Sequence, residues 1–461
     1  MGRSRLGVVA ALALTLAGRA GAAEITNIAT RGEPGHPFDL RISFRWDRFQ
    51  ERAQITREVP TAPTAGSPTG GVAEGDELRY ERKVNAFVPR VAIGVTHDLE
   101  VHFEWPYVAG DDRTWRYGQG AGGQPSGPAG NTIETNAVDA NNAACAADVD
   151  GAGPLVCPLF IVGSPDTTVY HGGRAGDLKS GIAWGIFDDK EDPTKPFWLV
   201  GVDVTFPTAA RYDPAGDRDP KSLLWVSPHT KAGDPGAVGE KVWKWDFQTV
   251  LSRRLGPIDP YVKAHLLFMT KSSGTYSNCD HAAELAGRPN PEMNSQAPAN
   301  CAAQGSKADA RLPWMAGITF GTELVPYENE ADQQRVALDF RLFGDYTSAA
   351  RFYNELTDMS GKLNWTDEYL TMGGYFGISL RASKFITLQG STSISTSTAH
   401  WLTGEPLGNG GSWPALGAGG ITADPSQMNP NFDWRYDAPG RRFRISEVAN
   451  FAMSFAFVLT F

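Results

Sequence analysis

The 461-residue chain has no long run of apolar residues beyond its first 18 positions. A membrane-spanning helix needs about 20 mostly apolar residues in a row. The rest of the sequence therefore predicts no helical transmembrane segment. Two classes remain for an exported chain: a soluble protein, or a β-barrel whose alternating strands do not register as hydrophobic segments.

The chain also lacks a surplus of positive charge and the common catalytic motifs. Its 42 Lys and Arg against 52 Asp and Glu give a formal net charge of −10, which argues against nucleic acid as a partner. No histidine is followed two places on by serine, as in the outer-membrane phospholipases, and neither G-x-S-x-G nor H-E-x-x-H occurs. We therefore expect no enzyme.

Cysteine is scarce, and its four copies form two local pairs in stretches rich in Gly, Ala, Asn and Pro. The pairs are Cys145 with Cys157 and Cys279 with Cys301. No C-x-x-C, C-x-x-C-H or cluster of histidines accompanies them, so we expect neither a metal site nor covalent haem, and no other cofactor. In an exported protein this arrangement predicts two loop disulfides.

The N-terminus is typical of a secretory signal. Arg3 and Arg5 precede the apolar stretch 6–18, and the small residues of 20–23 follow. We expect residues 1–23 to be removed, so that the mature chain begins at Ala23 or Glu24 and 24–461 forms one domain. A retained membrane anchor is the alternative for this stretch.

The last twelve residues, "NFAMSFAFVLTF", alternate between large apolar and smaller or polar side chains. A period of two indicates a β-strand with two unlike faces. Twelve stretches show such a strand pattern. They are 38–49, 85–95, 99–108, 176–187, 197–207, 241–254, 260–271, 311–321, 335–346, 368–380, 384–396 and 450–461.

The connections between these stretches alternate in length. Short turns follow every second one, and long polar segments follow the others: 50–84, 109–175, 208–237, 272–309, 347–367 and 397–442. An even number of strands with short turns on one side and long loops on the other is the pattern of an outer-membrane barrel. We therefore predict an all-β, antiparallel transmembrane barrel of about twelve strands in the outer membrane of a Gram-negative bacterium, with short periplasmic turns and long extracellular loops.

The lengths of the strands support a barrel over an exported β-sandwich or propeller. Most have the roughly 9–11 residues that a tilted crossing requires, whereas soluble strands usually have about 5–6. Aromatic residues at strand ends are expected to form interfacial girdles: Trp46, Trp105, Tyr107, Phe206, Tyr261, Tyr346, Tyr369 and Phe461. The final Phe457, Leu459 and Phe461 resemble the signal that the outer-membrane assembly machinery reads, so that machinery and the lipid bilayer are the expected partners.

The polar face of each strand should line the barrel interior. The predicted lumen residues are Asp39, Arg41, Arg45, Asp47, Glu100, His102, Glu104, Lys179, Asp203, Lys244, Asp246, Lys263, His265, Asp339 and Arg341. In a narrow barrel they either pair with one another and fill the interior or line a pore and tune its selectivity. For His102 and His265, a ligand or proton-sensing role stands against a hydrogen-bonded place in the wall.

One segment resembles a known family. In "VPRVAIGVTHDLEVHFEWPYV" (88–108), the turn around Thr96 and Asp98 and the closing Pro106 and Tyr107 are similar to the outer-membrane barrel transporters named for the meta-pathway of phenol degradation. The segments 176–187 and 201–209 also resemble that family, although Ala209 stands where the family has glycine. The resemblance implies passage of small, organic or aromatic compounds.

We therefore expect a channel or transporter that passes small solutes across the outer membrane. A non-conducting surface barrel, such as an adhesin, a sensor or a partner scaffold, is the alternative. An outer-membrane hydrolase is a weaker one. Its only support is a set of acids in two predicted outer loops, in "DDR" (111–113) and "NELTDMS" (354–360), where a rim protease would need them.

Overall fold

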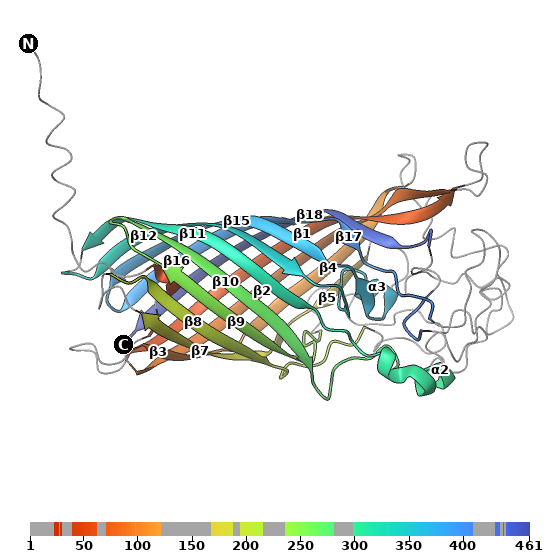
Figure 1. The fold of residues 1–461 in the computed structure, drawn as a ribbon, viewed down its shortest axis with the longest axis horizontal. Helices are drawn as coiled ribbons and strands as arrows, with labels where there is room; N and C mark the ends of the chain where they lie inside the picture. The colour runs from red at the N-terminus through yellow and green to blue at the C-terminus, as the bar shows by residue number, and fades with distance from the viewer. Residues whose placement is uncertain are drawn as a thin grey trace, which may run out of the picture.

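The computed structural model describes residues 23–29 except 27, 39–61, 71–120 except 97, 167–187, 194–214, 236–280, 298–408 except 330, and 429–461 except 434–436 and 438. Within these ranges the structure is almost entirely β (Figure 1). No helix in the described part of the chain is long and apolar enough to cross a membrane.

Twelve antiparallel strands form one closed barrel, as the sequence predicts. Three of them are interrupted: β3 continues as β4, β5 and β6 continue as β7, and β16 continues as β17. The wall elements are β1 (Leu40–Thr61), β2 (Gly71–Thr96), β3 (Leu99–Glu104), β4 (Tyr107–Gly120), β5 (Thr167–His171), β6 (Arg174–Ala175), β7 (Leu178–Phe187), β8 (Phe197–Phe206), β9 (Val242–Ser252), β10 (Ile258–Lys271), β11 (Trp314–Asn329), β12 (Gln334–Thr347), β15 (Tyr369–Ser383), β16 (Ile386–Ser397), β17 (His400–Trp401) and β18 (Phe443–Thr460).

The first and last strands close the barrel. β1 pairs with β2 on one side and with β18 on the other. At the end of this seam the Leu40 amide donates to the Phe461 carbonyl at 3.2 Å, and the Phe461 amide donates to the Leu40 carbonyl at 2.9 Å. Closure leaves no unpaired strand edge, which is a requirement inside a bilayer because no water is present to satisfy it.

The two faces of the wall differ as the alternation predicts. Large apolar side chains point outward, with 57% of Phe44, 70% of Leu342 and 53% of Phe455 exposed. Titratable side chains on the opposite face of the wall point inward, and only 4% of His102 and 6% of Asp203 are exposed. A continuous apolar surface around a closed barrel is stable only in lipid. The chain is thus an outer-membrane β-barrel of a Gram-negative bacterium.

The wall extends further on the extracellular side than the sequence pattern indicated. β1 reaches Thr61 and β2 begins at Gly71 within the predicted loop 50–84, and β4 and β5 occupy both ends of the predicted loop 109–175. Beyond the bilayer a strand needs no apolar face. These extensions are therefore polar or mixed on both sides, and a search for alternation does not detect them.

Two of the eight predicted girdle aromatics lie inside the barrel instead. Tyr261 is buried, and its hydroxyl donates to Asp339 at 2.5 Å. Tyr369 stacks on His400 with ring centroids 4.2 Å apart. The reason is strand parity: Tyr261 lies two residues from Lys263, so both side chains share the inward face. The girdle prediction was wrong for these two residues.

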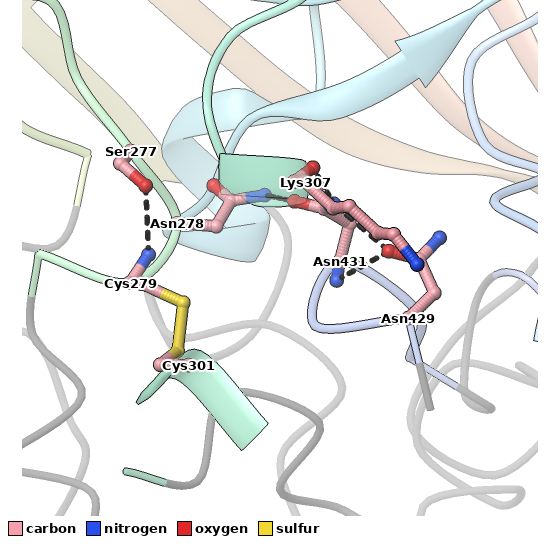
Figure 2. Close-up of a disulfide and its surroundings, with 7 residues drawn as sticks. All are labelled: Ser277, Asn278, Cys279, Cys301, Lys307, Asn429 and Asn431. Atoms are coloured by element: carbon pink, nitrogen blue, oxygen red, sulfur yellow. Dashed lines mark hydrogen bonds between the residues drawn. A yellow bond between two sulfur atoms is a disulfide. The ribbon is translucent and has the colours of Figure 1, made fainter. Parts of the chain in front are cut away.

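Short elements outside the wall lie at the two ends of the barrel. η1 (Glu24–Thr26) precedes the first strand, while α2 (Pro298–Gln304), η5 (Gly305–Lys307), β13 (Ala350–Phe352), α3 (Thr357–Ser360) and β14 (Asn364–Thr366) belong to extracellular segments. Cys279 and Cys301 form a disulfide that joins α2 to the chain after β10 (Figure 2). The predicted pair Cys145 and Cys157 lies outside the described residues.

Candidate functional site: the barrel interior

A segment that is not part of the wall packs inside the periplasmic end of the barrel. Ala23 and Ile28, on either side of η1, are buried in an apolar cluster with the inward-facing Phe197 and Leu199. Beyond them, the amide of Ala29 donates to Glu100 Oε2 at 2.6 Å. The sequence reasoning assigned no role to this stretch. The sequence feature that could have indicated burial of this stretch is the pair Ile25 and Ile28 before the first strand.

A band of charged side chains lies above this segment, and His102 is central to it. Its Nδ1 lies 3.1 Å from Glu100 Oε1 and its Nε2 lies 2.8 Å from Asp203 Oδ1. The ring thus lies between two carboxyl groups, with one nitrogen facing each of them. Arg90 reaches Glu100 at 2.6 Å and Lys179 reaches Asp203 at 2.9 Å. Each buried charge in this group has an opposite charge beside it.

A glycine lets His102 reach across the wall. His102 on β3 pairs with Gly181 on β7, which pairs with Asp203 on β8. A Cβ at Gly181 would overlap both the Asp203 carboxylate and the His102 ring. The missing side chain therefore leaves the space in which His102 and Asp203, two strands apart, meet.

The same arrangement occurs a second time. His265 on β10 pairs with Gly317 on β11, which pairs with Asp345 on β12. His265 Nε2 lies 3.3 Å from Asp345 Oδ1, and a Cβ at Gly317 would overlap both groups. His265 and Lys263 are both electrostatic neighbours of Asp246, and all three were predicted for the lumen. Asp345 is a member of this set that sequence reasoning missed, although it shares a strand face with Asp339 and Arg341.

The remaining predicted lumen residues form pairs on or near their own strands. Arg41 contacts Asp39 at 3.0 Å and Arg45 contacts Asp47 at 2.9 Å, each two residues along β1. The other contacts are Glu104 with Arg90 at 3.3 Å, Lys244 with Glu240 at 2.7 Å, and Arg341 Nε with Asp339 at 2.7 Å. The structure thus brings Glu100, His102, Lys179 and Asp203 together, and it leaves the β1 pairs separate from them.

A folded loop packs inside the extracellular end of the barrel. Asp358 in α3 is fully buried. It accepts hydrogen bonds from Arg113 at 2.9 Å and from Tyr212, and His171 Nε2 lies 3.0 Å away. Burial raises the pKa of Asp358, but His171 and Arg113 outweigh it and hold that pKa below its usual value. Burial and the nearby Asp358 carboxylate raise the pKa of Tyr212.

The loop also covers apolar wall. Leu356 and Met359, on either side of Asp358, are buried in a cluster with the inward-facing Ile55, Leu78 and Trp115. Asp358 belongs to the acidic stretch 354–360 considered above for a rim protease, and Asp111 to the other stretch. Both carboxylates are held by arginines, since Asp111 contacts Arg82 at 2.7 Å and Arg113 at 2.9 Å.

Within the described residues, no group of three or more His, Cys, Asp or Glu side chains is arranged to hold a metal ion.

Comparisons with known proteins add little to this picture. No family model matches the chain, and no curated protein matches it. Several solved structures are similar in outline. An outer membrane channel from Pseudomonas putida F1 has 9% identity and a TM-score of 0.38, over 91% of this chain and 95% of that one.

Two further solved structures compare in the same way. A FadL homologue from Pseudomonas aeruginosa has 7% identity and a TM-score of 0.33, over 92% of this chain and 90% of that one. A variant of the TodX monoaromatic hydrocarbon channel has 10% identity and a TM-score of 0.30, with the same coverage. At these values the likeness carries no argument about function.

Proposed function

We propose that the chain is an outer-membrane channel for small solutes, and that its interior is closed at rest by two movable segments. The observation that carries this proposal is that both closures are separate from the wall. The segment 23–29 lies inside the periplasmic end and α3 lies inside the extracellular end, and neither pairs as a strand with the barrel. Displacing either segment leaves the strand-to-strand pairing of the wall in place.

The wall beneath the two closures supports small organic or aromatic compounds as the solutes, as the family resemblance also implies. Each closure rests on inward-facing apolar side chains, Phe197 and Leu199 at one end and Leu78 and Trp115 at the other. The charged band lies between them. A solute on this route would meet apolar wall, then charged groups, then apolar wall. That sequence suits a compound with a ring and a polar substituent.

The lumen set given above is proposed as the lining of this route, with 24–461 as the mature barrel. The lumen residues already in ion pairs would set the ion preference of the open state rather than bind a solute tightly. A non-conducting surface barrel is the second candidate, and the double closure itself favours it. The two proposals differ in whether the closures move.

Single-channel conductance of the refolded mature chain in a planar bilayer tests the proposal. We expect brief or small openings of the wild type and larger, steadier ones when residues 24–29 are deleted. The ion preference of these openings should change in Arg41→Glu and in Glu104→Lys. A folded barrel that stays silent without residues 24–29, and also when this deletion is combined with Asp358→Asn to loosen the extracellular segment, would overturn the channel and favour the surface barrel.

A further inference from the structure

A hollow of about 970 Å³ lies at the extracellular rim, where β10 and β11 separate. Their pairing ends at Phe268 with Trp314. β10 continues to Lys271 alongside β9, whereas the chain before β11 turns away and pairs Arg311 with Arg351 of β13 through two backbone hydrogen bonds of 2.9 Å. The hollow lies in the gap that this separation leaves. Its size is in the range of small-molecule sites, about 300–1,000 Å³.

Ion pairs and amides hold the inner wall of the hollow rigid. Arg351 binds Glu405 through two nitrogens, one of them at 2.8 Å, and donates to the carbonyls of Lys307 at 2.7 Å and Asp309 at 3.2 Å. Asn429 donates to Glu405 and to the Pro406 carbonyl, each at 2.9 Å. The charges of Arg351 and Glu405 thus cancel, and the wall does not depend on a ligand for its shape.

The disulfide fixes a second side of the hollow. Cys301 in α2 is bonded to Cys279, and α2 leads through η5 to Lys307 at the rim. Figure 2 shows Asn431 between Lys307 and Asn429. It donates to the Lys307 carbonyl at 2.7 Å and to Asn429 Oδ1 at 2.9 Å. The position of Lys307 is therefore set by the covalent link on one side and by this amide on the other.

Two cations at the hollow are left without a carboxylate. Among the described residues, neither Lys307 nor Arg311 is in an ion pair: Lys307 Nζ donates only to Gln304 Oε1, at 2.8 Å. The Arg311 guanidinium lies over the Trp365 ring, 5.0 Å from its centroid. The third cation, Lys271, contacts Asp309 at 3.2 Å. The hollow therefore has a surplus of positive charge beside an indole ring.

The floor of the hollow is apolar. Met269, Ala310 and Leu312 line it, and all three pack on the buried cluster beneath the extracellular mouth. Cations beside an indole ring, together with an apolar floor, recognise two unlike parts of a ligand. An arginine donates well-directed hydrogen bonds to a carboxylate or a phosphate. An apolar body gains by leaving water.

We propose that this hollow is a binding site for an anion carried on an apolar body, with the anionic group on Arg311 and Lys307 and the body against Trp365, Met269 and Leu312. Two sources have this chemistry: a free aromatic carboxylate, and the phosphorylated headgroup of a membrane lipid. The proposal concerns equilibrium binding at the rim, so it does not depend on passage through the barrel.

Fluorine NMR of 4-fluorobenzoate, added to the refolded mature chain in zwitterionic micelles, tests the site. We expect saturable binding that is about tenfold weaker in Arg311→Gln, because a hydrogen bond to a charged group is lost. Arg311→Lys should recover part of the affinity. The matched control is Arg253→Gln, which removes an exposed arginine from the β9–β10 turn at the opposite end and should leave binding unchanged.

Two further probes test whether the site recognises the anionic group and whether its ligand is a free acid or a lipid. Uncharged 4-fluorobenzyl alcohol should bind far more weakly than the carboxylate. A monoacyl glycerophosphate that displaces the probe at much lower concentration would identify lipid as the occupant, and the reverse order would identify the free acid. The proposal is overturned if neither anion binds, if the alcohol binds as well as the carboxylate, or if folded Arg311→Gln binds like wild type.

Discussion

His102 Nε2 and Asp203 Oδ1 lie 2.8 Å apart although their strands are separated by β7. The bond passes over Gly181, and His265 and Asp345 repeat the arrangement over Gly317. Strand neighbours in a sheet lie about 4.8 Å apart, so short side chains two strands apart meet directly where the middle residue has no side chain. Each glycine thus sets which charges in the interior can pair.

Gly181→Ala should separate the His102–Asp203 pair and destabilise the barrel. The new Cβ would overlap both groups, and overpacking of this kind costs about 1–3 kcal/mol. Urea unfolding of the refolded barrel in lipid vesicles measures the loss. Gly344→Ala is the matched control, because the nearest atom to its added Cβ is 4.0 Å away. Equal stability of the two variants would mean that the pairing of His102 with Asp203 does not depend on the missing side chain at Gly181.

Ile28→Asp should release the segment that closes the periplasmic end. Ile28 is buried against inward-facing apolar side chains, and an unpaired carboxylate there costs several kcal/mol unless it moves to water. We expect severalfold more open time in single-channel recordings. Ile28→Leu, which keeps the apolar contact, should behave like wild type. An unchanged recording from a folded Ile28→Asp barrel would show that this segment does not control the route.

The sequence predicts the wall well and the interior only in part. Alternation on β1 or β18 identifies both faces, because the bilayer requires an apolar outer face. The pairing of His102 with Asp203 was not predictable, since it depends on strand register and on which residue opposes Gly181. The closures by Ile28 and by Asp358 were not predictable either. They are set by tertiary contacts between segments far apart in the chain, and neither stretch has a strand or helix pattern of its own.

Asp358 should make the extracellular closure sensitive to acid, but only at low pH. Its folded pKa is lower than that of an unfolded aspartate because of His171 and Arg113. The stability that it contributes is therefore complete above about pH 4, the ordinary aspartate pKa, and is lost as the pH falls through the lower folded value. Asp358→Asn should remove this dependence.

Conductance measured from pH 6 to pH 3 in wild type and Asp358→Asn checks the acid response. The wild type should open more as the pH falls below about 4, whereas the variant should be more open throughout and respond less over that range. Subtracting the conductance curve of Asp358→Asn from that of the wild type removes the contribution of other titrating carboxylates. Identical curves would show that the Asp358 ion pairs do not hold the loop.

Peptide mapping without reduction should find two local disulfides. The structure contains Cys279–Cys301, and the sequence predicts Cys145–Cys157. Cys279→Ser with Cys301→Ser should leave the barrel folded, because the link lies outside the wall. It should also speed trypsin cleavage after Lys307, whose position then depends on hydrogen bonds such as those from Asn431 and Arg351 to its carbonyl and no longer on a covalent link. A cross-link between the two pairs would contradict the assignment of each to its own loop.

Phe461 should act in two separable ways. Its backbone completes the β1–β18 seam through two hydrogen bonds with Leu40, whereas its exposed ring is the proposed signal to the assembly machinery. Phe461→Ser keeps the backbone and removes the ring. It should refold in vitro like wild type but give less heat-modifiable barrel in cells. Deletion of Phe461 should reduce both the refolding yield in vitro and the amount of barrel assembled in cells. Phe461→Trp should reduce neither. If Phe461→Ser assembled normally in cells, the ring would have no part in recognition, and the conformation of the last residue would be explained by closure of the barrel alone.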